Sequence, residues 1–371
     1  MIPVSRPFIA DADINAVTDA LRQGFVSGEA PIVGEFEREF ATAVGRTFGI
    51  AVSNGSVALD LAVHALDLKP GDEVVIPSFT IASCLFAVLR SKATPVFADV
   101  DPITWNLSVE TLEAVVTPRT RALIAVHVYG LPIDMTPVEQ LCRERGITIV
   151  EDAAESHTVR YQQRVCGSFG LLSTFSFYAN KAITCGEGGM IVTDDEVLSI
   201  RLRSLRNLAF LPAPGPRFVH EEIGWNARLS AIQAALGKSQ LARMNSVTQE
   251  KRRIGLAYDT ILGGSPHITM QPSATSYSEN MYWVVGVRLA DHFDAQTVAS
   301  RLRARGIDTR PFFFPLHRQP VLRSYSLSNQ RPLLVAERLG SQGIYLPSFV
   351  GITDSEIEQS ATTLTNVLHE N

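Results

Sequence analysis

Lys181 is the residue whose type and setting most favour covalent chemistry. It lies in the stretch SFYANKAITCGEGG (residues 176–189), between an aromatic run and a glycine-rich turn where the backbone can bend sharply. Only a lysine amine, and not an arginine, loses its proton at tolerable cost and attacks a carbonyl carbon; apolar walls lower its pKa further. By itself Lys181 would also fit a surface charge. We expect solvated charges at the other four lysines, which fall at helix ends, in turns or in polar helical stretches: Lys69, Lys92, Lys238 and Lys251.

Two further segments carry groups that bind ions. Asp152 ends the apolar run ITIVEDA (147–153), and ligands of open α/β sheets bind at the carboxyl ends of the strands. Gly55 and Ser56 open a helical pattern, and free N–H groups at a helix N-terminus bind phosphate. Taken singly, Asp152 also fits a helix cap or a structural ion pair, and the helix start fits an ordinary cap.

The three segments together fit one cofactor. Pyridoxal phosphate needs a lysine that binds its aldehyde, a carboxylate that keeps its ring nitrogen protonated and a cradle for its phosphate. Lys181, Asp152 and the Gly55–Ser56 helix start supply these groups, and the Ser176 hydroxyl is placed to reach the same phosphate. The combination is more specific than any of its members.

Alternating strands and helices must position these residues. The expected strands are apolar at consecutive positions, as in parallel strands buried on both faces: 73–79, 94–100, 121–130, 147–153, 173–178 and 189–195. Helical patterns lie between them, at 56–68 and 195–207 among others. This order predicts an α/β domain whose mainly parallel sheet is covered by helices.

A second, smaller unit follows the first. A loop rich in proline and glycine (208–226) precedes a long helical stretch (230–262), and a strand at 282–289 and a helix at 294–307 come after it. With 371 residues, two domains are expected. We predict a large cofactor-binding domain over residues 1–250 and a small C-terminal α+β domain over residues 251–371.

Composition excludes several other classes of protein. A net charge of -5 does not suit a nucleic-acid binder. The four cysteines form no C-x-x-C pair, which argues against a zinc site or a disulfide framework and for reduced thiols. No apolar run is long enough to span a membrane, and the N-terminus does not resemble a secretion signal. We therefore expect a cytoplasmic protein without a metal.

The sequence resembles the DegT/DnrJ/EryC1/StrS sugar aminotransferases, which have the fold type I architecture of pyridoxal-phosphate enzymes. The resemblance runs through nearly the whole chain, in motifs such as SGEAPIVGEFEREFA, VSNGSVALDLA, PGDEVVIPSFT, EDAAESH, FSFYANKAITCGEGG and GWNARLSAIQAALG. It implies a transfer of the amino group of L-glutamate to a keto sugar, during which the cofactor passes through pyridoxamine phosphate.

The resemblance also implies roles for individual residues. Lys181 would bind the cofactor and shuttle a proton, Asp152 would pair with the ring nitrogen, and Glu155 would lie near the ring hydroxyl. The phosphate would be held by Gly55, Ser56, Ser176 and, from the partner subunit of a homodimer, Asn226. Weaker candidates for sugar contacts are His157, Arg310 and His317.

Within the family, the segments DPITWNLSVETLEAVVTP, RFVHEEIGWN and TRPFFFPLHRQP favour GDP-4-keto-6-deoxymannose as the acceptor and GDP-perosamine as the product. UDP-linked, dTDP-linked or free keto sugars stay open as alternatives. A related dehydratase has a histidine in place of the lysine, so Lys181 favours amino transfer. A member that serves as a regulator would need a degraded site, which the intact lysine and aspartate argue against. Two positions depart from the pattern: Ile81 replaces an aromatic residue over the ring, and Thr158 replaces a glycine.

Overall fold

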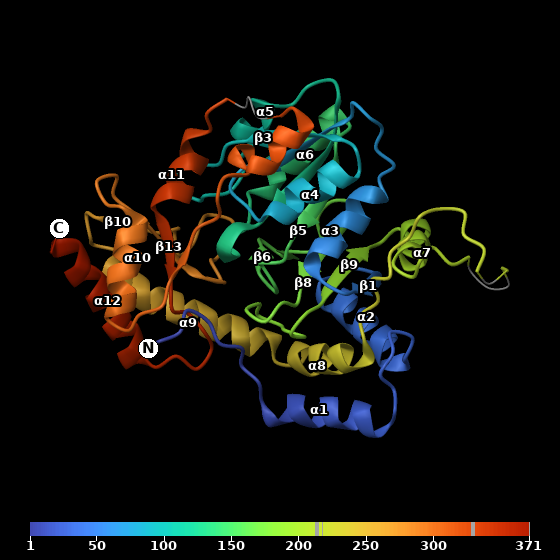
Figure 1. Cartoon of the computed structure of the whole chain (residues 1–371), viewed down its shortest axis with the longest axis horizontal. Helices are drawn as coiled ribbons and strands as arrows, with labels where there is room; N and C mark the ends of the chain where they lie inside the picture. The colour runs from blue at the N-terminus through green and yellow to red at the C-terminus, as the bar shows by residue number, and fades with distance from the viewer. Residues whose placement is uncertain (212–214, 217, 328–330, 371) are drawn as a thin grey trace.

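The computed structural model describes residues 1–211, 215–216, 218–327 and 331–370. A seven-stranded sheet in the order β1-β9-β8-β5-β4-β2-β3 forms the centre of the larger unit. The pairs along β8-β5-β4-β2-β3 are parallel, whereas β9 is antiparallel to both β1 and β8. The prediction of a mainly parallel sheet covered by helices is therefore confirmed (Figure 1).

All six strands predicted for this sheet are present, each shorter than its apolar run. The seven strands are β1 (Phe48–Val52), β2 (Glu73–Pro77), β3 (Thr94–Ala98), β4 (Thr120–Val126), β5 (Thr148–Asp152), β8 (Leu172–Ser176) and β9 (Gly189–Thr193). Along β2, Val74 and Ile76 belong to one buried cluster and Val75 to another. Both faces of the strand are thus covered, which explains the consecutive apolar residues.

Helices form the outer layers of the larger unit: α1 (Asp11–Arg22), α2 (Pro31–Ala43), α3 (Gly55–His64), α4 (Ala82–Arg90), α5 (Val109–Glu113), α6 (Met135–Arg145), α7 (Glu196–Leu205) and α8 (Ala231–Leu241). A small hairpin of β6 (Arg160–Tyr161) and β7 (Arg164–Val165) lies outside the main sheet. The long helical stretch expected at 230–262 is divided into α8 and α9 (Met244–Leu262). Among the described residues, no helix is both long and apolar enough to cross a membrane.

The second unit is built on a four-stranded antiparallel sheet in the order β10-β11-β13-β12. Its strands are β10 (Ile268–Thr269), β11 (Val285–Leu289), β12 (Arg310–Pro311) and β13 (Gly343–Leu346), and its helices are α10 (Ala295–Ala304), α11 (Leu334–Gln342) and α12 (Asp354–His369). Ile2 bridges to Ile307 and packs in the core of this unit. Helix α9 runs through residues 250 and 251, so the domain boundary proposed there stays a prediction.

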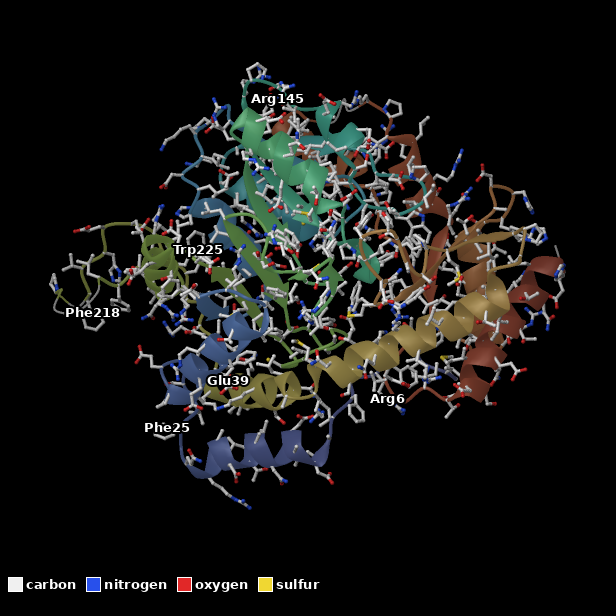
Figure 2. All side chains as sticks on the ribbon, turned by 180° about the vertical axis from the view of Figure 1, so that it is seen from behind. Arg6, Phe25, Glu39, Arg145, Phe218 and Trp225 are labelled. Atoms are coloured by element: carbon white, nitrogen blue, oxygen red, sulfur yellow. The ribbon has the colours of Figure 1, made fainter. Side chains whose placement is uncertain are left out.

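One segment stands away from the rest of the chain. Residues that follow α7 project from the large unit, with Phe218 toward the far end and Trp225 where the chain returns (Figure 2). Within this segment, the Phe210 and His220 backbones form an antiparallel bridge. Ile223 is 87% exposed, which is unusual for a large aliphatic side chain. Residues 212–214 and 217 of the proline-rich loop lie outside the described part of the chain.

Candidate active site

Lys181 lies in the turn that follows β8, where its backbone N–H donates to the Tyr178 carbonyl. Its Nζ lies 3.7 Å from Oε1 of Glu155. Burial lowers the pKa of Lys181, although Glu155 and Asp152 oppose that shift. Burial likewise raises the pKa of Glu155 to about 7. Burial thus shifts the pKa values of the amine and the carboxyl toward each other, which is the environment in which side chains act as acids and bases.

Asp152 is the last residue of β5 and is almost fully buried. Its Oδ1 accepts the backbone N–H of Ala154 at 3.1 Å, and the thiol of Cys84, on α4, lies 3.6 Å from Oδ2. Burial raises the pKa of Asp152, while the Ala154 N–H and the charge of Lys181 act in the opposite direction. A cation or N–H group at the free side of Oδ2 would stabilise this carboxylate.

A hydroxyl-lined helix start lies beside the lysine turn. Asn54 caps α3 by accepting the Val57 N–H at 2.9 Å. A Cβ at Gly55 would lie 2.7 Å from Cβ of Ser176, so only glycine lets the helix start approach that strand end. Ser56 Oγ lies 2.6 Å from Oγ of Ser83, a residue of α4 that sequence reasoning had missed. N–H groups and hydroxyls thus converge as a phosphate requires.

These groups line one cavity of about 630 Å³. It brings together Lys181, Asp152, Glu155, Ser176 and the Gly55–Ser56 helix start, as the sequence predicted. Further lining residues were not predicted: Thr80, Ser83, Tyr178, Asn180, Trp283, Phe313 and Tyr345. The last three come from outside the large sheet, and each of their rings packs against the ring of Tyr129. Ile81 also lines the cavity and is 44% exposed, so it is available for aliphatic contact.

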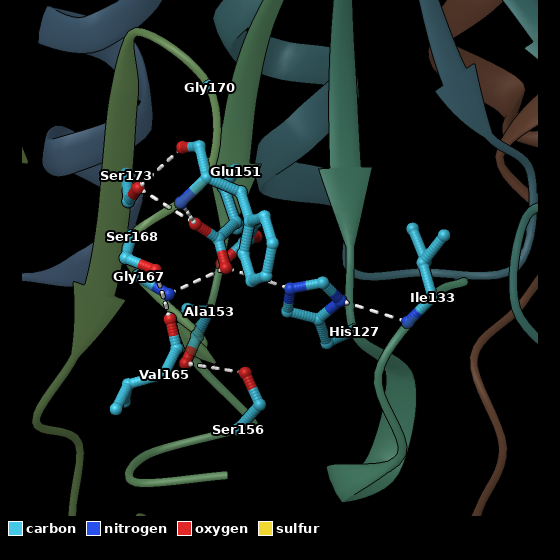
Figure 3. Close-up of polar contacts among 12 residues, drawn as sticks. His127, Ile133, Glu151, Ala153, Ser156, Val165, Gly167, Ser168, Gly170 and Ser173 are labelled. Carbon is cyan, nitrogen blue, oxygen red and sulfur yellow. Dashed lines mark hydrogen bonds and ion pairs between the residues drawn. The ribbon is translucent and has the colours of Figure 1, made fainter. Parts of the chain in front are cut away.

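A buried polar network surrounds Glu151, the residue before Asp152 on β5 (Figure 3). Glu151 Oε1 lies 2.8 Å from Nε2 of His127, and the two carboxylate oxygens also accept the N–H groups of Gly167 and Phe169. Nδ1 of His127 accepts the Ile133 N–H, so Nε2 carries the proton toward Glu151. Cys166 lies close enough to His127 and Glu151 to complete a metal-sized cluster. Because both carboxylate oxygens already have donors, this cluster is a structural network.

The three candidate sugar contacts lie in different surroundings. His157 is buried among Phe40, Phe175 and Phe177 and does not line the cavity. His317 is also buried; its Nδ1 lies 2.6 Å from Ser78 Oγ and its Nε2 2.8 Å from Glu337 Oε1. Both of its ring nitrogens are therefore occupied.

Arg310 and Asn226 lie outside the cavity of their own chain. The Arg310 side chain is about half exposed, pairs with Asp308, and lies in register with Tyr345, which lines the cavity. Arg310 is thus placed at the rim. Asn226 is exposed at the base of the projecting segment and lines no part of the cavity in its own chain.

The expectation of a solvated charge is wrong for Lys251. Its side chain is 6% exposed, and its Nζ donates to the carbonyl and hydroxyl of Ser348. Burial lowers the pKa of Lys251 to about 7. The polar pattern around it hid the apolar stripe of α9 that includes Val247 and Ile254 and packs inward.

The described residues fit pyridoxal phosphate on structural grounds. An amine and a carboxylate face one cavity, and the cradle beside Ser176 admits no side chain at position 55. In the same cavity, Oδ1 of Asn180 is buried and has no hydrogen-bond partner among the described residues. A buried polar atom without a partner is costly, and a bound polar ligand would remove that cost.

Comparisons with known proteins agree with this site. The DegT/DnrJ/EryC1/StrS aminotransferase family matches residues 7–365. GDP-perosamine synthase of Caulobacter vibrioides is 35% identical over 99% of this chain and 98% of its own length. A UDP-N-acetyl-3-dehydro-alpha-D-glucosamine 3-aminotransferase of Acidithiobacillus ferrooxidans is 33% identical over 90% of this chain and 88% of its own.

A solved structure is similar over the whole chain. The aminotransferase TlmJ of Streptoalloteichus hindustanus superposes with a TM-score of 0.92 at 29% identity, and the match covers 100% of this chain and 99% of that one. Fold, cavity and relatives agree in assigning amino transfer to this architecture. The chain therefore belongs to the DegT/DnrJ/EryC1/StrS aminotransferase family and is a pyridoxal-phosphate-dependent sugar aminotransferase.

Proposed function

We propose that this enzyme transfers the amino group of L-glutamate to C4 of a nucleotide-linked 4-keto-6-deoxy sugar. The acceptor we assign is GDP-4-keto-6-deoxymannose, which gives GDP-perosamine. The observation that carries the chemistry is the single cavity in which Lys181 faces Glu155, with Asp152 at its base. The choice of acceptor rests on the 35% identity to a GDP-perosamine synthase along nearly the full length of both chains.

Each residue has a defined task in this proposal. When bound, pyridoxal phosphate supplies a ring that accepts the electron pair left when a proton leaves carbon. Lys181 binds the cofactor, and its Nζ takes the α-proton of glutamate and later delivers a proton at C4 of the sugar. Burial favours both steps because it lowers the pKa of Lys181.

The remaining residues bind and orient. Asp152 pairs with the ring nitrogen and holds its proton, because a buried carboxylate needs a positive partner. The α3 N-terminus and the hydroxyls of Ser56 and Ser176 would hold the phosphate. Glu155, which lines the same cavity, would lie near the ring hydroxyl. His157 and His317 retain only indirect roles in sugar binding, because other groups surround them.

We further propose a homodimer in which Asn226 of the partner subunit completes the phosphate site. The projecting segment, with Ile223 and Val219 exposed, supports this arrangement because such side chains are stabilised by burial against another surface. A cytoplasmic location fits the four free, buried cysteines.

The acceptor can be identified directly. The purified enzyme would be incubated with L-glutamate and, separately, with GDP-, UDP- and dTDP-linked 4-keto-6-deoxy sugars, and product masses measured. An amino sugar from the GDP substrate supports the proposal, and one from the UDP or dTDP substrate alone overturns the acceptor. A product that has lost water without gaining nitrogen would indicate a dehydratase. Lys181→Ala is the control and should form no product.

A further inference from the structure

Trp283 makes two contacts with the lysine turn. Nζ of Lys181 lies 3.6 Å from the centroid of the Trp283 ring, within the range of a cation–π interaction. The indole Nε1–H of the same residue donates to the Asn180 carbonyl at 2.9 Å. One side chain thus contacts both the reactive amine and the backbone directly before it.

The segment that carries Trp283 is held firmly against the large unit. Met281 donates its N–H to the carbonyl of Gly130 in the large unit, and within the segment Tyr282 donates its N–H to Oδ1 of Asn280. Tyr282 has a φ of 56°, a left-handed conformation that is costly for an aromatic residue. Strand β11 begins at Val285, after this turn, although the apolar pattern that predicts the strand begins at Tyr282.

Gly130 confirms how closely this segment approaches. Its φ is +100°, and a Cβ at this position would lie 2.7 Å from the backbone nitrogen of Trp283. The close approach and the strained turn persist only where surrounding contacts compensate for their cost. Strain of this kind is frequent where a side chain must be aimed at a functional group.

We propose that Trp283 is the positioning residue that holds the free amine of Lys181 toward the cofactor cavity. This inference rests on the proposed role of Lys181. Whenever Lys181 is not joined to the cofactor, its flexible four-carbon chain would otherwise sample many rotamers. The indole face favours the ammonium form from one side, and Glu155 contacts Nζ from the other.

The test measures capture of pyridoxal phosphate by full-length protein from which the cofactor has been dialysed. The rate of capture as a function of pH gives the apparent pKa of Lys181 as a midpoint, and its high-pH plateau reports the position of the neutral amine. The titratable groups that act on this amine are Glu155, Asp152 and His157. These three groups are unchanged in the variants, so differences in the midpoint or the plateau report the effect of the indole.

We expect Trp283→Leu to lower the midpoint by about 1 pH unit, because the cation–π interaction is lost. Its plateau should fall by about tenfold, because the amine is no longer held in place. Trp283→Phe retains a ring face but has no N–H for Asn180, so its midpoint should move less while its plateau still falls. Trp283→Phe also keeps the inference testable if Trp283→Leu does not fold.

Tyr282→Phe is the matched control, since it removes from the neighbouring residue a buried hydroxyl that has no hydrogen-bond partner among the described residues. It should match the native protein in both readouts. Unchanged midpoint and plateau in both tryptophan variants, or equal changes in Tyr282→Phe, would overturn the inference. Borohydride reduction followed by peptide mass analysis separates the two proposals. If the native protein is modified at a residue other than Lys181, the proposed function itself is refuted. If Lys181 is modified and the tryptophan variants behave like the native protein, only the positioning role is refuted.

Discussion

The thiol of Cys84 lies 3.6 Å from Oδ2 of Asp152, and both groups are buried. Burial raises the pKa of the thiol well above its ordinary value, so it stays protonated and acts as a donor to the carboxylate. Thr80, which also lines the cavity, lies 4.0 Å from the same sulfur. The carboxylate is thus supported from α4 before any ligand binds.

Cys84→Ala should lower the free energy of unfolding at pH 8 by about 1–2 kcal/mol more than Cys185→Ala does, because it removes a donor to a buried carboxylate. Cys185 is the control, since burial alone raises its pKa. Urea unfolding of the cofactor-free protein measures both, and Cys84→Ser should recover part of the loss. Equal losses in the two alanine variants would show that the thiol does not support Asp152.

His157 gives the protein a defined sensitivity to acid. Burial lowers its pKa from 6.5 to about 3, so its contribution to stability is complete above pH 6.5 and declines as the pH falls toward 3. Between pH 7.5 and 5 the native protein should lose about 2 kcal/mol relative to His157→Asn, which does not titrate. Parallel curves of unfolding free energy against pH for the two proteins would contradict this.

Thr158, which stands where the family pattern has a glycine, forms a contact that glycine could not make. It has a φ of 64°, which favours glycine and strains a β-branched residue, and its hydroxyl lies 2.5 Å from that of Thr248. We expect Thr158→Gly to be more favourable in a Thr248→Val background than in the native protein. The coupling free energy should be about 1 kcal/mol, because the hydrogen bond is then already absent. Additive changes in a double-mutant cycle would exclude this coupling.

Substitution of His317 should affect the stability of the protein, whereas substitution of Arg310 should affect binding of the sugar substrate. His317→Asn should lower the melting temperature while leaving KM for the sugar nearly unchanged, because the ring bridges Ser78 and Glu337. Arg310→Ala should leave the melting temperature unchanged, because the side chain is about half exposed, and should raise KM for the nucleotide sugar. KM for glutamate is the internal control. The opposite assignment of the two effects would restore His317 as a sugar contact.

Much of the fold and the cofactor groups could be predicted because their signals are local. Apolar runs predicted the strands. Asp152 ends one strand, Lys181 lies in the turn after another, and Gly55 begins a helix. Cys84 and Trp283 could not be found in this way. Their contacts join residues 68 and 103 positions apart, and neither residue type in its local pattern indicates a site.

For Lys251, the local sequence predicted the wrong environment. Its neighbours in sequence are polar and charged, which predicts a solvated amine, but the side chain is buried beside Ser348 near the other end of the chain. Burial of a lysine depends on packing between distant segments, which helical periodicity alone does not reveal. The division of the stretch 230–262 at residues 242 and 243 was missed for a similar reason, since no glycine or proline marks it.

The bridge between Ile2 and Ile307 has a consequence for synthesis of the chain. Ile2 completes a core whose other members, including Leu364 and Val367, are made long after it. Ile2 therefore stays unpacked until the segment that carries Leu364 and Val367 has left the ribosome. Docking of Ile2 is thus a late event in the assembly of this core, and a fragment that starts at residue 251 would lack both Ile2 and the first turns of α9.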